Sequence, residues 1–379
     1  MRNPDKPYTW LFALRVIVKT ALLFTVLNLA FAALTPLPTL GRLSIYNWLV
    51  PGRERLPYGE NQSEAYNLSL NNLNAMFASH VISTSKAENE YRVLLVGDSS
   101  TWGFLLEPHD TLTGKLNVAN LETETGKQVR AYNTGYPTMS LTKDLLLLDY
   151  AMRYELDMVI WLVTLESFPR SEQFESPPIQ NNPEVMRELI EKYDLNLNPD
   201  DSRFVEYDFL EQTIIGQRRA LADLLRLQLY GVMWANTGID QSYPEEYDLR
   251  QSDFDEDITW KSFSEPQALS EDDLVFDVLQ AGAARIEEAG IPFLFVNEPM
   301  FISSGTNSNI RYNFFYPRWA YDEYRERLAS LAESENWFYI DLWDVIPADE
   351  FTDSPVHMTP EGMQQLSGIL APEILELAE

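Results

Sequence analysis

The pattern of apolar and polar positions along residues 91–379 predicts strands that alternate with helices. Short segments with the composition of strands are predicted at 92–96, 128–133, 157–163, 291–296 and 337–341, and most of them are apolar runs. Segments with apolar residues at helical spacing occur at 110–125, 140–154, 271–289, 318–334 and 359–377. Strands that alternate with helices indicate βαβ units and a parallel sheet. We therefore expect an α/β fold, a flavodoxin-like three-layer α/β/α sandwich with a five-stranded parallel sheet.

Residues 165–270 interrupt this alternation. The segment is rich in Pro, Asn, Asp, Glu and aromatic residues, and a helix is predicted for 209–234. A long excursion from a compact domain is typical of a lid or a binding loop, and the alternative is a solvated surface insertion. Residues 41–90 are punctuated by Pro and Gly and are interpreted as a connector, with helical spacing at 66–79. The main domain is accordingly expected to comprise residues 91–379.

The first 40 residues contain the most apolar part of the chain. Residues 20–40 carry no charge, and Arg15 and Lys19 precede them. About 20 apolar residues span a bilayer, and basic residues before the span favour a cytoplasmic N-terminus. We expect residues 1–40 to form a cytoplasmic tail and a signal anchor of a single-pass cell-membrane protein whose main domain is extracytoplasmic. The alternatives are a signal peptide cleaved near residues 30–32 and a helix buried in a soluble protein.

The composition excludes several classes of function. The chain has 58 acidic and 28 basic residues and a formal net charge of −30, which argues against nucleic-acid binding because phosphate contacts need clustered Lys and Arg. It has no cysteine and three histidines, so no thiolate site and no histidine-rich catalytic zinc site is expected. No phosphate-loop Lys follows Gly97 at the required spacing. We expect no metal and no cofactor.

The first predicted strand ends abruptly at Gly97, Asp98 and Ser99. Gly97 permits backbone angles that other residues avoid and so allows a sharp turn. A helix is expected to begin directly after it, which would place the Ser99 hydroxyl near unsatisfied backbone N–H groups. Such groups favour a nucleophile and, later, an oxyanion. The alternative is that Asp98 or Ser99 only caps the helix.

A serine nucleophile needs a base, and histidine is the usual one. Of His80, His109 and His357, only His357 lies just before a predicted helix start and has an acidic residue, Asp353, close upstream. We therefore expect His357 to be the base.

Further polar or glycine positions follow the predicted strands. Gly135 follows the second strand, Thr164 the third, and Asn297 and Glu298 the fourth. In parallel sheets, ligands bind beyond the carboxyl ends of the strands. We expect Asn297 and Glu298, together with Asp98, to contact the substrate, and the alternative for Asn297 is that it caps the turn after the strand.

On these residues the chain resembles the SGNH (GDSL-like) hydrolases, over roughly residues 91–377. The resemblance implies that Ser99 is the nucleophile, that His357 is the base and that Asp353 orients the imidazole. It also implies that the N–H groups of Ser99 and Gly135 form the oxyanion hole.

The predicted oxyanion hole departs from the pattern of this family. The family has an Asn side chain after the third strand, where this chain has Thr164. Thr164 is expected to supply a hydroxyl in its place. As alternatives, Asn181 or Asn182 could reach in from the insertion.

The spacing between the acidic residue and the histidine also differs from the pattern of this family. Three residues separate Asp353 from His357 where the family has two, and Ser354 occupies the usual position of the acid. Either a bulge at Pro355 compensates for the extra residue, or the site works as a Ser–His dyad.

These observations predict a serine esterase-type hydrolase. Its expected substrate is a small acyl or acetyl ester or an acylated glycan, and the resemblance to exported, membrane-anchored relatives adds O-acetyl groups of a surface polysaccharide. The alternatives are an O-acetyltransferase that uses the same residues and a non-catalytic, membrane-tethered module that binds or assembles glycans. No nucleic-acid partner is expected, and the N-terminal helix is the expected contact with the membrane.

Overall fold

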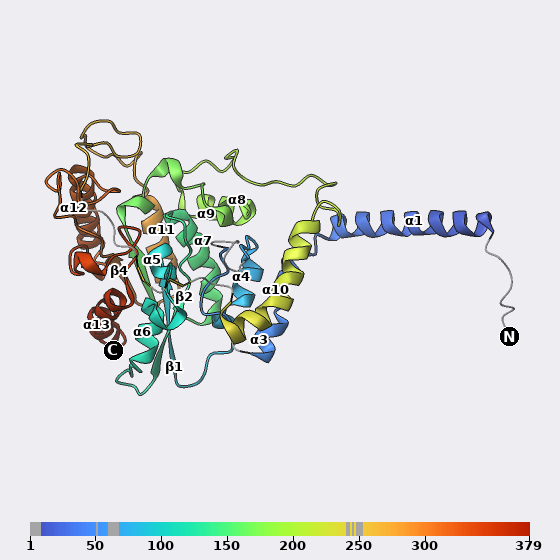
Figure 1. Cartoon of the computed structure of the whole chain (residues 1–379), viewed down its shortest axis with the longest axis horizontal. Coiled ribbons are helices and arrows are strands. Elements are labelled where there is room, and N and C mark those ends of the chain that lie inside the picture. The colour runs from blue at the N-terminus through green and yellow to red at the C-terminus, as the bar shows by residue number, and fades with distance from the viewer. Residues whose placement is uncertain (1–8, 51, 60–67, 240–242, 245, 248–252) are drawn as a thin grey trace.

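Five parallel strands form the centre of the molecule (Figure 1). The computed structural model describes residues 9–50, 52–59, 68–239, 243–244, 246–247 and 253–379. The predicted cytoplasmic tail at 1–8, the start of the helix predicted for 66–79, and parts of the connector and the insertion therefore lie outside the described residues.

The described strands pair in the order β2-β1-β3-β4-β5, and every pair is parallel. Their bounds are β1 Glu90–Val96, β2 Gln128–Asn133, β3 Met158–Val163, β4 Phe293–Asn297 and β5 Tyr339–Asp341. This is the flavodoxin-like strand order, in which ligands bind at the carboxyl ends of the strands. The predicted fold class and sheet are confirmed.

Alternate residues of each strand point to opposite faces of the sheet, and helices cover both faces. In β1, Val93 and Leu95 pack with α6 (Leu112–Val118) and α13 (Pro360–Leu377). Leu94 and Val96 face the other side, which is covered by α7 (Leu141–Ala151), α11 (Phe276–Glu287) and α12 (Arg318–Ser334). The result is the expected three-layer sandwich.

Two of the predicted helices are shorter in the structure because the chain beside them forms other contacts. The helix predicted for 110–125 ends at Val118, because the chain turns at Asn120 (φ 50°) and returns to pair with β2. The helix predicted for 271–289 begins only at Phe276, because Leu274 pairs with Pro169 in a β-bridge.

The insertion contains more helix than was predicted. Its helices are α8 (Pro177–Gln180), α9 (Pro183–Tyr193) and α10 (Arg218–Thr237). The helix predicted for 209–234 thus begins nine residues later, at Arg218, and the residues before it form turns.

The described part of the connector packs against the main domain. The short helix α2 (Leu37–Gly41) leads into it, and it contains α3 (Ile45–Leu49) and α4 (Leu73–Ser79). Tyr46, Leu56 and Phe77 are buried in the same apolar core as α7. The segment therefore adds to the core of the domain.

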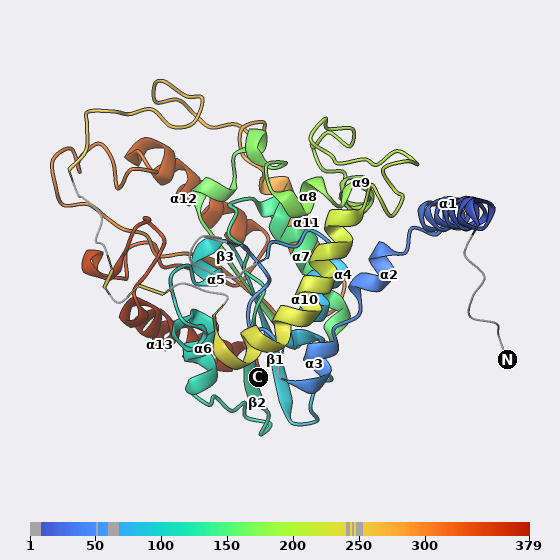
Figure 2. The same cartoon turned by 45° about the vertical axis from the view of Figure 1, so that its right-hand side comes forward.

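The N-terminal helix α1 (Trp10–Leu34) extends away from this body (Figures 1 and 2). Its 25 residues correspond to about 37 Å, at a rise of about 1.5 Å per residue. Among the described residues it is the one helix long and apolar enough to cross a membrane, and few of its residues are buried. Such a helix is compatible with a membrane anchor or a signal sequence.

Candidate active site

Ser99 lies in the sharp turn that follows β1. It is the first residue of the one-turn helix α5 (Ser99–Trp102), and the Asp98 carboxylate caps this turn by accepting a hydrogen bond from the Ser100 N–H at 2.8 Å. Glycine at position 97 is required by close packing, because a Cβ there would lie 2.2 Å from Thr101 Oγ1. The unusual backbone angle predicted for Gly97 is not observed, since Gly97 is not among the described residues with positive φ.

The fold brings Ser99, His357 and Asp353 into one hydrogen-bonded chain. The Ser99 Oγ lies 2.8 Å from His357 Nε2, and His357 Nδ1 lies 2.9 Å from Asp353 Oδ1. An ionised carboxylate only accepts hydrogen bonds, so Nδ1 carries the imidazole proton and donates it to Asp353. Nε2 is then left to accept the hydrogen bond from the Ser99 hydroxyl, which is the arrangement of a nucleophile with its general base.

The loop between Asp353 and His357 accommodates the extra residue. Its ends are tied together, because the Thr352 N–H donates to the His357 carbonyl at 2.8 Å and Phe351 forms a β-bridge with Met358. Asp353 therefore reaches Nδ1 although three residues lie between it and His357. Burial opposes ionisation of Asp353, but the hydrogen bond and charge of His357, together with the hydrogen bond from the Thr352 hydroxyl, outweigh it and lower the pKa of Asp353.

The ring of Phe104 positions the imidazole. It stacks on His357 with the ring centroids 4.9 Å apart and the planes 22° from parallel. The Phe104 N–H donates to the carbonyl of Ser99 at 3.1 Å, so the stacking residue and the nucleophile belong to one turn. Sequence reasoning missed Phe104, and its place five residues after Ser99 gave no signal of this contact.

Two of the expected oxyanion donors have partners within the protein. The Gly135 N–H donates to Asn133 Oδ1 at 3.0 Å. The Thr164 hydroxyl is fully buried and lies 2.8 Å from the hydroxyl of Tyr316. Among the described residues, the Ser99 N–H has no hydrogen-bond partner, so it is the expected donor that remains open to an oxyanion.

The two asparagines considered as replacements in the insertion are also engaged. The side-chain amide of Asn181 donates to the Pro177 carbonyl at 2.9 Å, and that of Asn182 donates to the Asn71 carbonyl at 2.8 Å. Both bonds hold the insertion in place and do not connect to Ser99.

Asn297 has a structural position. It is fully buried, and its amide donates to Asp341 at 2.8 Å while its carbonyl oxygen accepts from the Tyr324 hydroxyl at 3.0 Å. The predicted substrate contact is not supported for Asn297, because its side chain has no access to solvent and its polar atoms are used by neighbouring helices and strands.

A buried ion pair lies directly beneath the nucleophile turn. Lys143 and Asp144 of α7 are almost fully buried and lie 2.5 Å apart. The Lys143 ammonium donates to the carbonyls of Gly97 at 2.7 Å and Tyr136 at 3.1 Å, which ties the turn after β1 to the loop after β2. Sequence reasoning missed this pair, although two adjacent charges inside the leucine-rich run of α7 were a usable signal.

Asp98 and Glu298 form a second buried acidic group near Ser99. Both are almost fully buried, and neither oxygen of Glu298 has a hydrogen-bond partner among the described residues. Burial, strengthened by the nearby Asp98, raises the pKa of Glu298 well above its usual range. Burial also raises the pKa of Asp98, although the charge of Lys143 opposes it. Burial beside a second carboxyl therefore favours the protonated form of Glu298 in the folded protein.

Replacing Glu298 by glutamine is expected to stabilise the protein more as the pH rises. Folded Glu298 keeps its proton above the usual pKa of 4.5, whereas the unfolded side chain loses it, so the stability of the native protein falls as pH rises through that range. Glu298→Gln removes this loss while keeping the shape of the side chain. Urea unfolding at about pH 5 and about pH 8 would measure the difference.

The matched control for this prediction is Glu124→Gln, which removes an exposed carboxylate. It should leave the pH dependence of the unfolding free energy unchanged. A Glu298→Gln variant that loses stability with pH in parallel with the native protein would show that Glu298 is ionised.

The other two histidines are not part of the site. His80 is fully buried, its Nδ1 accepts from the Ile82 N–H at 3.0 Å, and burial lowers its pKa to about 4. His109 is exposed at the surface beside Glu107 and Asp110. Across the described part of the chain, no group of three or more His, Asp or Glu side chains is arranged to hold a metal ion.

Comparisons by sequence find no relatives, and a comparison by structure finds esterases. No protein-family model matches this chain, and no curated protein matches it. A lipase/acylhydrolase from Enterococcus faecalis has a TM-score of 0.35 and 13% identity, with 75% of this chain and 95% of that chain covered. A carbohydrate acetylesterase family member from Sinorhizobium meliloti has a TM-score of 0.34 and 11% identity, with 76% of this chain and 99% of that chain covered.

A further neighbour, the native aryl esterase of M. smegmatis, has a TM-score of 0.33 and 13% identity, with 76% of this chain and 99% of that chain covered.

Proposed function

We propose that this chain is a membrane-anchored serine esterase that hydrolyses acyl or acetyl esters. The observation that carries the proposal is the continuous path from the Ser99 hydroxyl through the His357 imidazole to the Asp353 carboxylate, with contacts of 2.8 and 2.9 Å. These are the distances that proton transfer from a nucleophile to its base requires. The path lies at the carboxyl end of β1, where ligands of this strand order bind.

In the proposed reaction, Ser99 Oγ attacks the ester carbonyl carbon while His357 Nε2 takes its proton. The N–H of Ser99 donates to the oxygen that becomes negatively charged. The imidazolium then gives its proton to the leaving alcohol as the C–O bond breaks, which leaves an acyl group on Ser99. Water, activated by the same imidazole, releases the acid and restores the serine.

We place the enzyme in the cell membrane through α1, with the catalytic domain outside the cytoplasm. Support comes from the length and apolar character of α1 and from Arg15 and Lys19 in its first half, since basic residues favour the cytoplasmic side. A domain held there meets cell-surface polymers, so O-acetyl groups of a surface polysaccharide are the substrate class that we propose. An assay with an added acceptor sugar separates a hydrolase from a transferase. A transferase would pass the acetyl group to the sugar, whereas a hydrolase would release it as acetate.

A fluorophosphonate probe is expected to label Ser99 stoichiometrically. In this reaction Ser99 Oγ forms a bond to phosphorus, fluoride leaves, and His357 takes the serine proton. Mass spectrometry of the digested protein would locate the label. Heat-unfolded protein is the control and should remain unlabelled, because the labelling depends on the folded contact between Ser99 and His357.

One observation favours a competing function. The N–H of Gly135 and the hydroxyl of Thr164 have partners within the protein, and removing one oxyanion donor typically costs about 10²–10³ in turnover. A non-catalytic, membrane-tethered glycan-binding module does not need open oxyanion donors, so these internal hydrogen bonds would not impair it. An unlabelled Ser99 together with retained sugar binding would support that module and overturn the esterase.

A further inference from the structure

The exposed apolar side chains outside α1 are concentrated on one part of the molecule. Large hydrophobic residues that are exposed in the described structure cluster in segments 40–49 and 207–239; outside these two segments and α1 they are Val118, Phe338 and Val345. The two segments pack against each other, because the side chain of Gln228 in α10 bonds to the backbone of Leu43 and Ile45. Concentrated exposed apolar surface marks a contact with a partner or a membrane.

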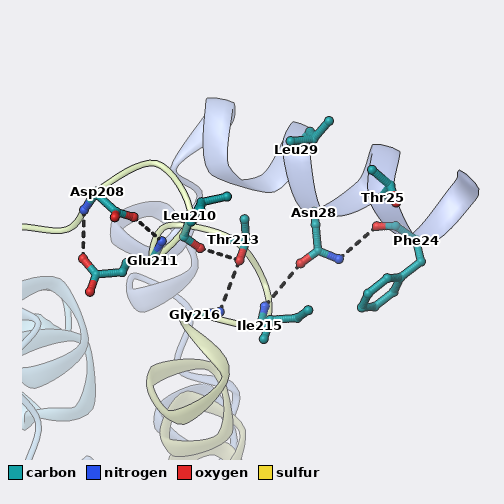
Figure 3. A pocket seen from close by; sticks show the side chains of 10 residues that line it. All are labelled: Phe24, Thr25, Asn28, Leu29, Asp208, Leu210, Glu211, Thr213, Ile215 and Gly216. Atoms are coloured by element: carbon teal, nitrogen blue, oxygen red, sulfur yellow. Dashed lines mark hydrogen bonds between the residues drawn. The ribbon is translucent and has the colours of Figure 1, made fainter. Parts of the chain in front are cut away.

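The turns before α10, here called the 207–217 loop, carry this surface up to α1. Phe209, Leu210 and Ile215 are 50%, 70% and 55% exposed. The Ile215 N–H donates to the side-chain oxygen of Asn28 on α1 at 3.3 Å, and Figure 3 shows the loop beside this face of the helix. Asn28 also donates to the Phe24 carbonyl of its own helix at 2.9 Å.

A crevice of about 480 Å³ separates the loop from α1 (Figure 3). Phe24, Thr25 and Leu29 line it from α1, and Leu210 and Ile215 line it from the loop. Its two acidic residues are held by the loop itself: Asp208 accepts from the Glu211 N–H, and Glu211 accepts from the Asp208 N–H. The apolar wall of the crevice therefore continues the surface of α1.

The height of the loop along α1 follows from the contact with Asn28. Asn28 lies six residues before the end of α1 at Leu34, which corresponds to about 9 Å along the helix axis. If α1 crosses a bilayer, a loop in contact with Asn28 lies at the depth of the membrane surface or just below it. Interfacial segments bury their apolar side chains about 5–10 Å into that layer.

The charge of this region also fits a lipid surface. Residues 207–239 contain three acidic and three basic residues, in a chain whose formal net charge is −30. Arg218 and Arg219 follow the loop directly, and among the described residues neither forms an ion pair with a carboxylate. Arginines at this height are placed to meet lipid phosphates.

We propose that the 207–217 loop inserts into the interfacial layer of the bilayer beside α1, so that a lipid surface is the partner of this face. The catalytic domain is then held at two points and in one orientation relative to the membrane. This inference rests on the membrane position of α1 in the proposed function and is independent of the ester chemistry.

The absence of cysteine from the chain allows a direct test. Single-cysteine variants of the full chain, Leu210→Cys, Leu22→Cys and Val118→Cys, are labelled with a nitroxide and reconstituted in vesicles of zwitterionic and anionic phospholipids. Leu22 lies on α1, and Val118 lies on α6, far from α1 in both views (Figures 1 and 2). Collision with oxygen reports lipid, and collision with a water-soluble nickel chelate reports water.

The nitroxide at position 210 is expected to collide more with oxygen than with the nickel chelate, and so is the nitroxide at position 22. The nitroxide at position 118 should collide more with the nickel chelate than with oxygen. A position-210 label that behaves like position 118 overturns the inference, and low collision with both agents indicates a protein partner and also overturns it. A water-exposed label at position 22 overturns the membrane position itself, while Ser99 activity tests the chemistry separately.

A second pair of variants tests the contact that holds the loop. Asn28→Leu removes the acceptor of the Ile215 N–H and keeps α1 apolar, so the position-210 label should gain collision with nickel. Thr25→Leu is the matched control, because Thr25 lines the same crevice and forms no hydrogen bond with the loop among the described residues. If the position-210 label collides equally with the nickel chelate in both variants, Asn28 does not position the loop.

Discussion

Replacing Ser99 by alanine is expected to lower the rate of ester hydrolysis by a factor on the order of 10⁶. The variant loses the oxygen that forms the acyl intermediate, and among the described residues it is the Ser99 hydroxyl that bonds to His357 Nε2. The side chain is small and 9% exposed, so its loss should not prevent folding. The measurement is kcat on an acetyl ester with the full chain, together with a thermal unfolding curve.

Ser100→Ala is the matched control for this prediction. It removes the neighbouring buried hydroxyl, which has no hydrogen-bond partner among the described residues, and it preserves the Ser100 N–H that Asp98 caps. Most of the activity should remain. Unchanged hydrolysis by Ser99→Ala would show that another group attacks the ester and would overturn the proposed mechanism.

Replacing His357 by glutamine is expected to have an effect of similar size, on the order of 10⁶ in kcat. A glutamine amide fills part of the imidazole space but cannot take the proton of Ser99 near neutral pH. The contact of 2.8 Å between Ser99 Oγ and His357 Nε2 makes this proton transfer the step that is lost. The measurement is kcat of the full chain on the same acetyl ester.

Asp353→Asn separates a triad from a Ser–His dyad in the same assay. The asparagine no longer holds the imidazole with its proton on Nδ1, and a loss of roughly 10⁴ is expected. Ser354→Ala is the control, because Ser354 occupies the position where the resemblance places the acid but makes no side-chain bond to His357. If Asp353→Asn hydrolyses the ester at the rate of the native protein, Ser99 and His357 act as a dyad without Asp353.

The order of strands and helices was predictable because it depends on local patterns. The strands β1, β3 and β4 are mostly apolar runs short enough for one crossing of the sheet. The helix α12 was predicted with its observed bounds because its apolar spacing begins after Pro317 and ends before Trp337. The predictions were wrong for helix ends that depend on contacts with distant residues. The start of α11 at Phe276 is decided by the pairing of Leu274 with Pro169, which no local pattern shows.

The residues of the path Ser99–His357–Asp353 were identifiable because strand ends of a parallel sheet meet at one edge. The surroundings of the path were not identifiable. Whether the Gly135 N–H is open depends on the rotamer of Asn133, and whether Thr164 is open depends on Tyr316, which is 152 positions away.

By itself, then, the sequence determined the α/β class, the apolar N-terminal helix and the residue types that can form a nucleophile and its base. Periodicity and residue chemistry are local properties, so a single chain displays them without its fold. Only the tertiary structure decided that Lys143 ties the two strand-end loops together, that Asn297 is buried away from any substrate and that Asn28 meets Ile215. Each of these depends on which distant donor reaches which acceptor, and that is settled by packing in three dimensions.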